Sequence, residues 1–251
     1  MTELSDSELL RYSRQVMLDE FDVAGQQALL QRKVAVVGLG GLGSPVAMYL
    51  ASAGVGSLVL CDFDAVDSSN LQRQILHGET DVGAPKTDSA AQAIHAINAG
   101  TAVETICEKL GPENLEALVA GVDLVVDCSD NLALRVELNR SCQRLQRPLV
   151  SGAAIRWQGQ VTVFDFREQD IACYQCLYPG TSDVELNCAT SGVIAPLLGV
   201  IGSMQALECI KLLVGAGEPL QGRLLMFDGL YGEWQELRVN RNPECPLCSL
   251  S

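Results

Sequence analysis

The chain has little positive charge and almost no histidine. Its 251 residues include 17 Lys and Arg against 31 Asp and Glu, which gives a formal net charge of −14. Nucleic acids attract basic surfaces, so this balance argues against a nucleic-acid partner. The two histidines, His77 and His95, have no spacing typical of metal ligands, and we expect both to be structural.

A long hydrophobic run is also missing. The most apolar stretch, residues 192–207, is shorter than the ~20 residues that a membrane-spanning helix needs, and charged residues follow it. We expect a buried helix or a subunit interface there, and no membrane partner. The first 20 residues carry five acids and two arginines instead of an apolar signal core, so we expect a cytoplasmic protein. The chain has ten cysteines, and in the cytoplasm cysteines more often bind metal or take part in chemistry than form disulfides.

One segment has a pattern typical of nucleotide binding. An apolar run at 34–37 leads into a glycine-rich turn at 38–43 and a helical stretch at 44–53. A second apolar run at 57–60 ends in the carboxylates Asp62 and Asp64. Glycines let backbone N–H groups approach a phosphate closely, and a helix N-terminus adds partial positive charge. An acid that closes the second strand can accept hydrogen bonds from ribose hydroxyls. The pattern predicts a nucleotide site without naming the nucleotide.

The alternation of strands and helices continues along the chain and then changes. Residues 159–166 alternate apolar and polar side chains with no helix before them, which predicts an antiparallel addition to a parallel sheet. Ser5 and Glu8 form a capping box at the start of the first expected helix. Strands are expected at 34–37, 57–60, 102–107, 124–127, 148–153, 159–166, 222–227 and 233–239, and helices at 5–19, 24–31, 44–53, 86–98, 112–119, 135–145 and 195–213.

The expected fold class is α/β. It is a Rossmann-like mixed β-sheet flanked by helices, with a parallel N-terminal half and antiparallel C-terminal strands. We expect a single domain over residues 1–251, since no linker, repeat or low-complexity tract divides it. Its nucleotide-binding half would cover about 1–150 and its second half about 151–251.

Four polar residues allow both a structural and a functional interpretation. Arg14 on the first helix is, by itself, best read as a solvated cation. Lys86 opens a helix, where a lysine opposes the helix dipole, and this misfit indicates a use. Asp127 and Asp130 follow a strand at the edge where open α/β sheets bind ligands, although either could cap the next helix instead.

Two cysteine pairs with identical spacing predict a structural zinc site. Cys173 and Cys176 form one C-x-x-C pair, and Cys245 and Cys248 form the other, which together suit tetrahedral zinc. Four unrelated thiols or a redox pair is the alternative. Cys188 lies in a polar loop, where a thiol is either a nucleophile or a bystander. The other thiols fall in or beside expected strands and helices and are expected to be buried and inert: Cys61, Cys107, Cys128, Cys142 and Cys209.

Taken together, these motifs resemble the MoeB/ThiF/HesA family, bacterial relatives of the ubiquitin-activating enzymes. The resemblance covers essentially the whole chain, and the segment at 151–164 is most similar to the branch that serves molybdopterin synthase. The motifs that carry it are GLGGLGS at 38–44, DFDAVDSSNLQRQIL at 62–76, Lys86, DCSDN at 127–131, both cysteine pairs and Cys188.

The resemblance implies a reaction and its partners. The enzyme would bind ATP and Mg²⁺ together with the C-terminal Gly-Gly tail of a ubiquitin-like sulfur carrier, the small subunit of molybdopterin synthase. The terminal carboxylate would attack the α-phosphate and give an acyl-adenylate and pyrophosphate, in molybdenum cofactor biosynthesis. A separate sulfur donor would then convert the activated end to a thiocarboxylate.

The resemblance also assigns roles to individual residues. Gly41 would present backbone amides to the nucleotide, and Asp62 would hold the ribose. Arg73 would contact the departing pyrophosphate, Lys86 the α-phosphate, and Asp130 the Mg²⁺ ion. The same nucleotide site would include Ser69, Asn70, Leu71, Gln72 and Asn131.

A homodimer is implied as well. Arg14 matches a family arginine that reaches the triphosphate of the neighbouring subunit, which replaces the solvated-cation interpretation. Each dimer would therefore contain two shared sites.

Other functions remain open at this point. Within the family, the alternative is adenylation of the thiazole-pathway carrier in thiamine biosynthesis, where Cys188 would take part in sulfur transfer, or one enzyme that serves both carriers. Outside it, an NAD-dependent oxidoreductase fits the early strand–helix–strand unit but leaves Arg73 and Lys86 without a purpose. A non-catalytic carrier-binding protein is the third alternative, and the polar residues of the nucleotide site argue against it.

Overall fold

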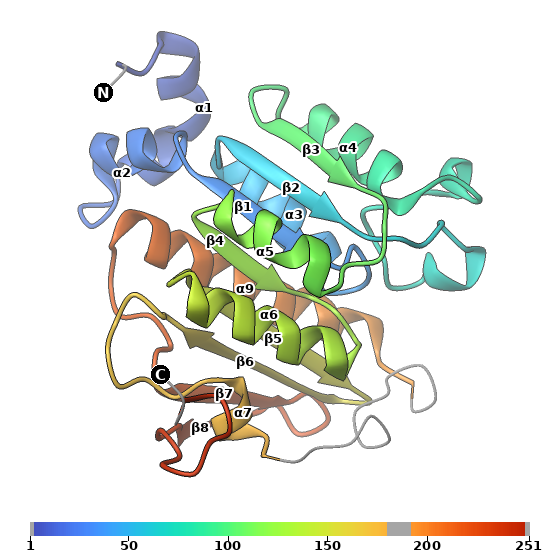
Figure 1. The fold of residues 1–251 in the computed structure, drawn as a ribbon. Helices are drawn as coiled ribbons and strands as arrows, with labels where there is room; N and C mark the ends of the chain where they lie inside the picture. Colours follow the sequence, from blue (N-terminus) through green and yellow to red (C-terminus); the bar gives the residue numbers. More distant parts are fainter. Residues whose placement is uncertain (1–2, 180–191, 249–251) are drawn as a thin grey trace.

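In the computed structural model, residues 3–179 and 192–248 are described, and one mixed sheet runs through them (Figure 1). The sheet has eight strands in the order β3-β2-β1-β4-β5-β6-β7-β8. Along the chain these are β1 (Lys33–Val37), β2 (Ser57–Cys61), β3 (Ala102–Ile106), β4 (Leu124–Asp127), β5 (Leu149–Ile155), β6 (Gln158–Phe164), β7 (Arg223–Asp228) and β8 (Glu233–Arg238).

The expected change of strand direction is confirmed. Strands β1 to β5 pair in parallel, whereas β6, β7 and β8 pair antiparallel. β5 and β6 form a hairpin in which Ile155 pairs with Gln158. The strand order reverses at β1, which lies between β2 and β4, and ligands of open α/β sheets bind beyond the carboxyl ends of strands at such a reversal.

Helices cover both faces of the sheet. The main helices are α1 (Asp6–Val16), α2 (Asp22–Leu29), α3 (Gly43–Ala53), α4 (Lys86–Ile97), α5 (Pro112–Ala120), α6 (Leu132–Arg144), α7 (Tyr174–Leu177) and α9 (Ala195–Val214). In Figure 1, α5 and α6 lie in front of the sheet, and α3 and α9 lie behind it. Successive residues of β1 alternate between two core clusters, one shared with α3, α4 and α9 and the other with α5 and α6. These strands are buried on both faces, as near-continuous apolar runs predict.

Local capping sets several helix boundaries. The Ser5 and Glu8 capping box at α1 is confirmed. At α6 the cap is Asn131, whose side chain accepts a hydrogen bond from the Leu134 N–H, so the preceding Asp130 is left for another use. The sequence did not predict the two short 3₁₀ turns, η1 (Ser68–Asn70) and η2 (Glu79–Asp81), which lie in the polar segment between β2 and α4.

The apolar helix α9 is a core element. By length and composition alone it could cross a membrane. An 18-residue window of the helix has a mean hydropathy of 1.7, but 56% of that window is buried inside the protein. α9 packs on α3, β5 and β6, and buried core helices pass the same test. The prediction of a buried helix at 195–213 is therefore confirmed.

The expectation for the scattered thiols needs one correction. Cys107 is exposed, because it follows β3, an edge strand with mostly exposed side chains. Cys61, Cys128, Cys142 and Cys209 are buried, as expected. Burial raises the pKa of Cys61 to about 12, which leaves its thiol protonated and inert at neutral pH.

Candidate functional site

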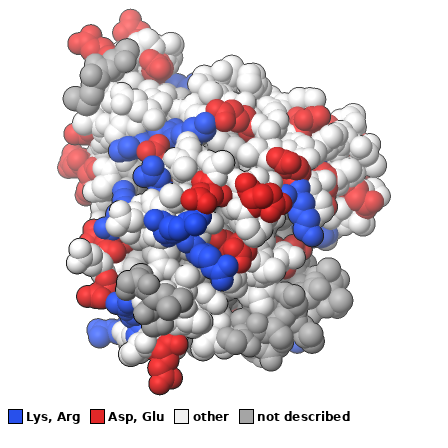
Figure 2. Space-filling view, viewed as in Figure 1, with Lys and Arg blue, Asp and Glu red and all other residues white. Residues whose placement is uncertain are grey.

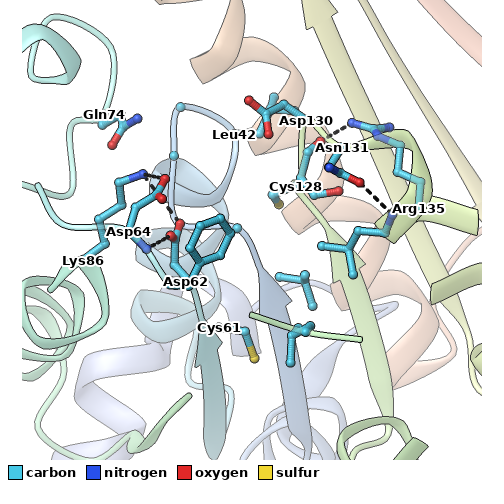
Figure 3. Close-up of a pocket in the computed structure, with 18 of the residues that line it drawn as sticks. Leu42, Cys61, Asp62, Asp64, Gln74, Lys86, Cys128, Asp130, Asn131 and Arg135 are labelled. Carbon is cyan, nitrogen blue, oxygen red and sulfur yellow. Dashed lines mark hydrogen bonds and ion pairs between the residues drawn. The ribbon is translucent and has the colours of Figure 1, made fainter. Parts of the chain in front are cut away.

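A cavity of about 750 Å³ lies at the carboxyl ends of β1, β2 and β4, where the strand order reverses. Figure 3 shows its two sides: Lys86, Asp64 and Asp62 face Asp130 and Arg135 across the opening. Of the residues assigned by sequence, the cavity wall contains Gly41, Asp62, Gln72, Arg73, Lys86, Asp130 and Asn131.

The glycine-rich turn has a shape that other residues would not permit. Gly38 has a φ of +90°, which disfavours L side chains. A Cβ on Gly43 would lie 1.9 Å from the Gly38 carbonyl oxygen, and one on Gly41 would lie 2.4 Å from a Leu198 methyl carbon. The Leu39 N–H donates to Asp62 Oδ2 at 2.8 Å, which fixes the turn to the end of β2.

Lys86 is buried between two carboxylates. Its Nζ lies 2.9 Å from Asp64 Oδ2 and 3.8 Å from Asp62 Oδ2, and only 7% of the lysine side chain is exposed. Since Lys86 is the first residue of α4, its charge opposes the helix dipole, and the two carboxylates offset this cost. Asp64 is half exposed at 51%, so an anion entering the cavity can compete with it for Lys86. The sequence marked Asp64 only as an acid that follows β2, without its pairing to Lys86.

The opposite wall carries the exposed acid Asp130, and a buried ion pair lies behind it. The Asp130 side chain is exposed and lines the cavity. Asp127, at 1% exposure, lies 3.6 Å from Arg135, and its carboxylate also accepts from the Ser129 and Ser151 hydroxyls. Arg135 donates to the Gly152 carbonyl at 3.0 Å and to the Ser129 carbonyl. This network holds the loop that carries Asp130 against β5.

Arg135 is a cavity residue that the sequence analysis did not identify. It contacts the Asp127 carboxylate at the end of β4 and the backbone carbonyls of Ser129 and Gly152. Position within a predicted helix was the only signal, and it does not distinguish a buried arginine from a solvated one.

In the polar segment after β2, hydrogen bonds to neighbouring residues fix the orientation of the Arg73 side chain. Arg73 donates to Asn70 Oδ1 at 3.0 Å and to the Ser69 carbonyl at 3.1 Å, and Gln74 also donates to Asn70. Gln72, Arg73 and Gln74 line the cavity, whereas Ser69, Asn70 and Leu71 do not. Asn70 therefore orients the arginine instead of facing the cavity itself.

Arg14 is a further assigned residue that does not line this cavity within one chain. It is exposed in the last turn of α1. Cys188 lies outside the described residues.

The four paired cysteines come together as their spacing predicted. Their sulfur atoms lie within 4.8 Å of one another, with Cys173 Sγ 3.7 Å from Cys245 Sγ and Cys176 Sγ 3.6 Å from Cys248 Sγ. Four thiolates at ~2.3 Å around a tetrahedral zinc ion are about 3.8 Å apart. The cluster is therefore compatible with a closed zinc site that joins the C-terminal segment to α7.

Charges of both signs are mixed on the face drawn in Figure 2, where Lys and Arg side chains lie next to Asp and Glu. On α6, for example, Arg140 pairs with Glu137 at 2.7 Å, and Arg144 pairs with Glu116 of α5. With a net charge of −14, a polyphosphate would depend on the cations gathered inside the cavity.

Comparisons with known proteins agree on the family and the fold. Residues 12–247 match the ThiF family. The chain is 50% identical to molybdopterin-synthase adenylyltransferase of Escherichia coli K12, over 99% of both chains. It is 44% identical to the sulfur carrier protein ThiS adenylyltransferase of the same organism, over 98% of this chain and 97% of that one. A crystal structure of E. coli MccB with MccA-N7isoASN has the same fold, with a TM-score of 0.83 at 23% identity over 95% of this chain and 74% of that one.

Proposed function

The chain belongs to the ThiF family, and from this premise we propose that it is an adenylyltransferase that acts on a sulfur-carrier protein. Its substrate is the C-terminal glycine of the small subunit of molybdopterin synthase, a ubiquitin-like carrier, and its products are an acyl-adenylate and pyrophosphate. The observation that carries this proposal is 50% identity, over 99% of both chains, to an enzyme named for that activity. The convergence of Asp62, Arg73, Lys86 and Asp130 on one cavity supports it.

The nucleotide binds beyond β1 and β2. The glycine turn presents backbone N–H groups to phosphate oxygens, and the N-terminus of α3 adds partial positive charge there. Asp62 accepts hydrogen bonds from the ribose hydroxyls in addition to the Leu39 N–H that it already binds.

The transfer step exchanges one bond to phosphorus for another. A carboxylate oxygen of the carrier's terminal glycine attacks the α-phosphorus, and the bond to the oxygen bridging to the β-phosphate breaks. That electron pair leaves with pyrophosphate. The protein forms no covalent bond in this step, so its contribution is alignment and charge stabilisation.

Lys86 and Arg73 supply the positive charge. Lys86, the first residue of α4, lies beside Asp62 in a nearly buried position, where its charge is weakly screened and its interaction with the α-phosphate is strong. When the triphosphate binds, Asp64 is displaced as the nearest partner of Lys86. Arg73, oriented by Asn70, makes forked contacts with the departing pyrophosphate.

Mg²⁺ would be held by Asp130. Magnesium prefers carboxylate and phosphate oxygens, and Asp130 is an exposed carboxylate in the cavity wall that caps no helix. The bound ion would neutralise charge on the triphosphate. Arg135 and Asp127 keep the Asp130 loop in place.

The active form is a homodimer in which Arg14 of each chain reaches the site of its partner. Arg14 lies on α1, outside the cavity of its own chain. Near it, α1 and the turn after it expose large apolar side chains, with Leu10 at 79%, Met17 at 73% and Leu18 at 54%. A second copy covering this surface would bury them, which supports the dimer.

The four-cysteine cluster binds one zinc ion per chain. Closed sites with four thiolates are structural, and this one ties the C-terminal segment to α7. Metal analysis of the purified protein should find about one zinc per chain. A chain with no metal, and with the same thermal stability after treatment with a chelator, would contradict this part of the proposal.

The thiazole-pathway carrier is the second candidate substrate. The 44% identity to a ThiS adenylyltransferase over nearly the whole chain favours it specifically, although less than the 50% identity to the molybdopterin enzyme. In either pathway, a separate donor supplies the sulfur that replaces the adenylate. Cys188 is the thiol that would link to the thiazole carrier.

Two substitutions test the catalytic assignment. Asp130→Asn and Arg73→Ala should each abolish carrier-dependent release of pyrophosphate from ATP while the protein stays folded. Asp88→Asn is the matched control, because Asp88 is an exposed acid on α4 that does not line the cavity. Normal rates in either cavity variant would show that the assigned role is wrong.

A further inference from the structure

His77 is a buried histidine that the proposed reaction leaves unused. Only 7% of the residue is exposed, and both ring nitrogens have partners. Nε2 lies 2.9 Å from the Leu39 carbonyl oxygen in the glycine turn, and Nδ1 lies 2.8 Å from Ser89 Oγ on α4. His77 thus joins two elements of the nucleotide site that are far apart in sequence.

The partners determine where the ring carries its proton. A carbonyl oxygen can only accept a hydrogen bond, so Nε2 must be protonated and donate to Leu39. On the other side, Ser89 Oγ lies 2.8 Å from Asp81 Oδ2, and Asp81 accepts a hydrogen bond from the Gly78 N–H at 2.8 Å. The chain of contacts therefore runs from the glycine turn through His77 and Ser89 to η2.

This contact sets the direction of a peptide group in the glycine turn. In a trans peptide the C=O and the following N–H point in opposite directions, so the Gly40 N–H points away from His77. Gly40 lines the cavity, and its N–H donates no hydrogen bond within residues 3–179 and 192–248. The Leu39 N–H is fixed as well, by its bond to Asp62, so the peptide groups on both sides of Leu39 are held.

We propose that His77 is a positioning residue for the nucleotide. Its Nε2–H holds the Leu39 carbonyl so that the Gly40 N–H faces the cavity and is free to donate to a phosphate oxygen. This inference rests on the proposed binding of ATP at the glycine turn, and it adds a residue that acts on the nucleotide only through the backbone.

The charged groups around the ring are compatible with this role. Lys86 disfavours a positive charge on the ring, while Asp62 and Asp81 favour one. Burial is the largest influence, and it lowers the pKa of His77 below its ordinary value of 6.5. Burial therefore favours the uncharged ring at neutral pH, with its single proton on Nε2 toward the Leu39 carbonyl, while the Ser89 hydroxyl donates to Asp81.

Two replacements separate positioning from simple filling of space. The side-chain amide of Gln can place its NH₂ group near the position of Nε2, whereas the shorter Asn reaches only the position of Nδ1. His77→Gln should therefore keep the bond to Leu39, and His77→Asn should lose it. His95→Gln is the control, because His95 is exposed on α4.

The measurement is the dissociation constant of Mg–ATP by calorimetry, on the full-length protein. We expect His77→Asn to weaken binding by about five- to tenfold, the typical value of one hydrogen bond, and His77→Gln and His95→Gln to stay within about twofold of the native chain. Equal weakening in both His77 variants, matched by equal losses of thermal stability, would show that His77 only fills space. Native affinity in His77→Asn would also overturn the proposal.

A second measurement needs no variant. The ¹⁵N chemical shifts of the native His77 ring should show Nε2 protonated at neutral pH, and a ring protonated only at Nδ1 would overturn the inference. A native protein that binds Mg–ATP but catalyses no pyrophosphate exchange would defeat the proposed adenylation, while the affinities would still decide the role of His77. A native protein that binds no nucleotide would overturn both.

Discussion

At the scale of single residues, the site keeps opposite charges close together before any ligand binds. Lys86 and Asp62 are almost fully enclosed, with side-chain exposures of 7% and 8%, and Asp64 shields the remaining positive charge. A buried charge that loses its partner is strongly destabilising, so these residues depend on one another for folding as well as for binding. Their effects on stability and on catalysis must therefore be measured separately.

Replacing Lys86 should remove catalysis more than it removes stability. We expect Lys86→Met to lower the rate of pyrophosphate exchange by about 10²–10³, because a positive charge at the transferred phosphate is lost. Lys33→Met is the control, since the Lys33–Glu104 ion pair is partly exposed and far from the cavity wall.

The double variant Lys86→Met with Asp64→Asn removes one of the unpaired carboxylates that Lys86→Met leaves behind. It should recover part of any lost thermal stability but none of the lost rate. A recovery of exchange activity in this double variant would contradict the role of Lys86 at the phosphate.

His77 should make the stability of the protein depend on pH in the acid range. Burial lowers the pKa of His77 below 6.5 in the folded state, so the unfolded chain binds the proton more readily. This contribution to stability is present above about pH 6.5 and is lost as the pH falls toward the lowered value. Urea unfolding of the native protein and of His77→Gln, compared between pH 5 and 8, should show a smaller decrease on acidification in the variant. An equal decrease of stability in both proteins would show that His77 does not contribute to the pH dependence.

The sequence allowed some site residues to be predicted and not others. Asp62 and Asp130 could be found because they follow apolar strands, and the carboxyl ends of parallel strands meet at one edge. Arg135 and His77 could not, because each makes a contact with a backbone carbonyl far away in the sequence, Arg135 with Gly152 and His77 with Leu39. The order of residue types along the chain does not indicate which backbone carbonyl a buried donor will contact.

At the scale of elements, the glycine turn between β1 and α3 is the feature most sensitive to substitution. Gly43 begins α3 and faces the Gly38 carbonyl so closely that no side chain fits. Gly43 lies outside the cavity wall, so the need for glycine at this position is structural and separate from nucleotide contact.

Gly43→Ala should therefore destabilise the fold by at least about 2 kcal/mol, because the new methyl group would overlap backbone atoms that cannot move independently. Gly199→Ala is the opposite case. A Cβ on Gly199 in α9 would meet nothing within 4 Å, and Ala is a better helix former than Gly by about 1 kcal/mol. Urea unfolding of both variants measures the difference, and a Gly43→Ala protein as stable as the native one would show that the turn is not as close as described.

The elements themselves were largely predictable, and the reason is physical. Apolar runs of β-branched residues, helix caps and glycine turns act over a few residues, so β1, α3 and the β5–β6 hairpin followed the pattern. The 3₁₀ turns η1 and η2 did not. Asp67 caps η1 by accepting a hydrogen bond from the Ser69 N–H, and Asp81 in η2 accepts one from the Gly78 N–H. Such short turns have no periodic pattern of apolar residues by which the sequence could reveal them.

At the scale of the whole molecule, the proposed homodimer places two half-sites on different chains. Arg14 comes from one chain and Asp130 from the other, so a mixture of two inactive variants should regain activity. When Arg14→Ala and Asp130→Asn chains are unfolded together and refolded, about half of the dimers are mixed, and each mixed dimer contains one intact site.

The mixture should recover about a quarter of the native exchange activity, while each variant alone stays inactive. Pyrophosphate exchange on the refolded mixture measures it, with the native chain unfolded and refolded as the reference. A mixture as inactive as its components would mean that Arg14 does not act across the dimer.

The most direct test of the central claim is ATP–pyrophosphate exchange with two purified carriers, the small subunit of molybdopterin synthase and the thiazole-pathway carrier, each added separately. Exchange should depend on the molybdopterin carrier and disappear when the C-terminal glycine of that carrier is removed. Exchange with both carriers would indicate one enzyme for two pathways, and exchange with only the thiazole carrier would move the assignment to the second candidate. No exchange with either carrier, in a folded protein that binds Mg–ATP, would contradict the proposed adenylation of these carriers.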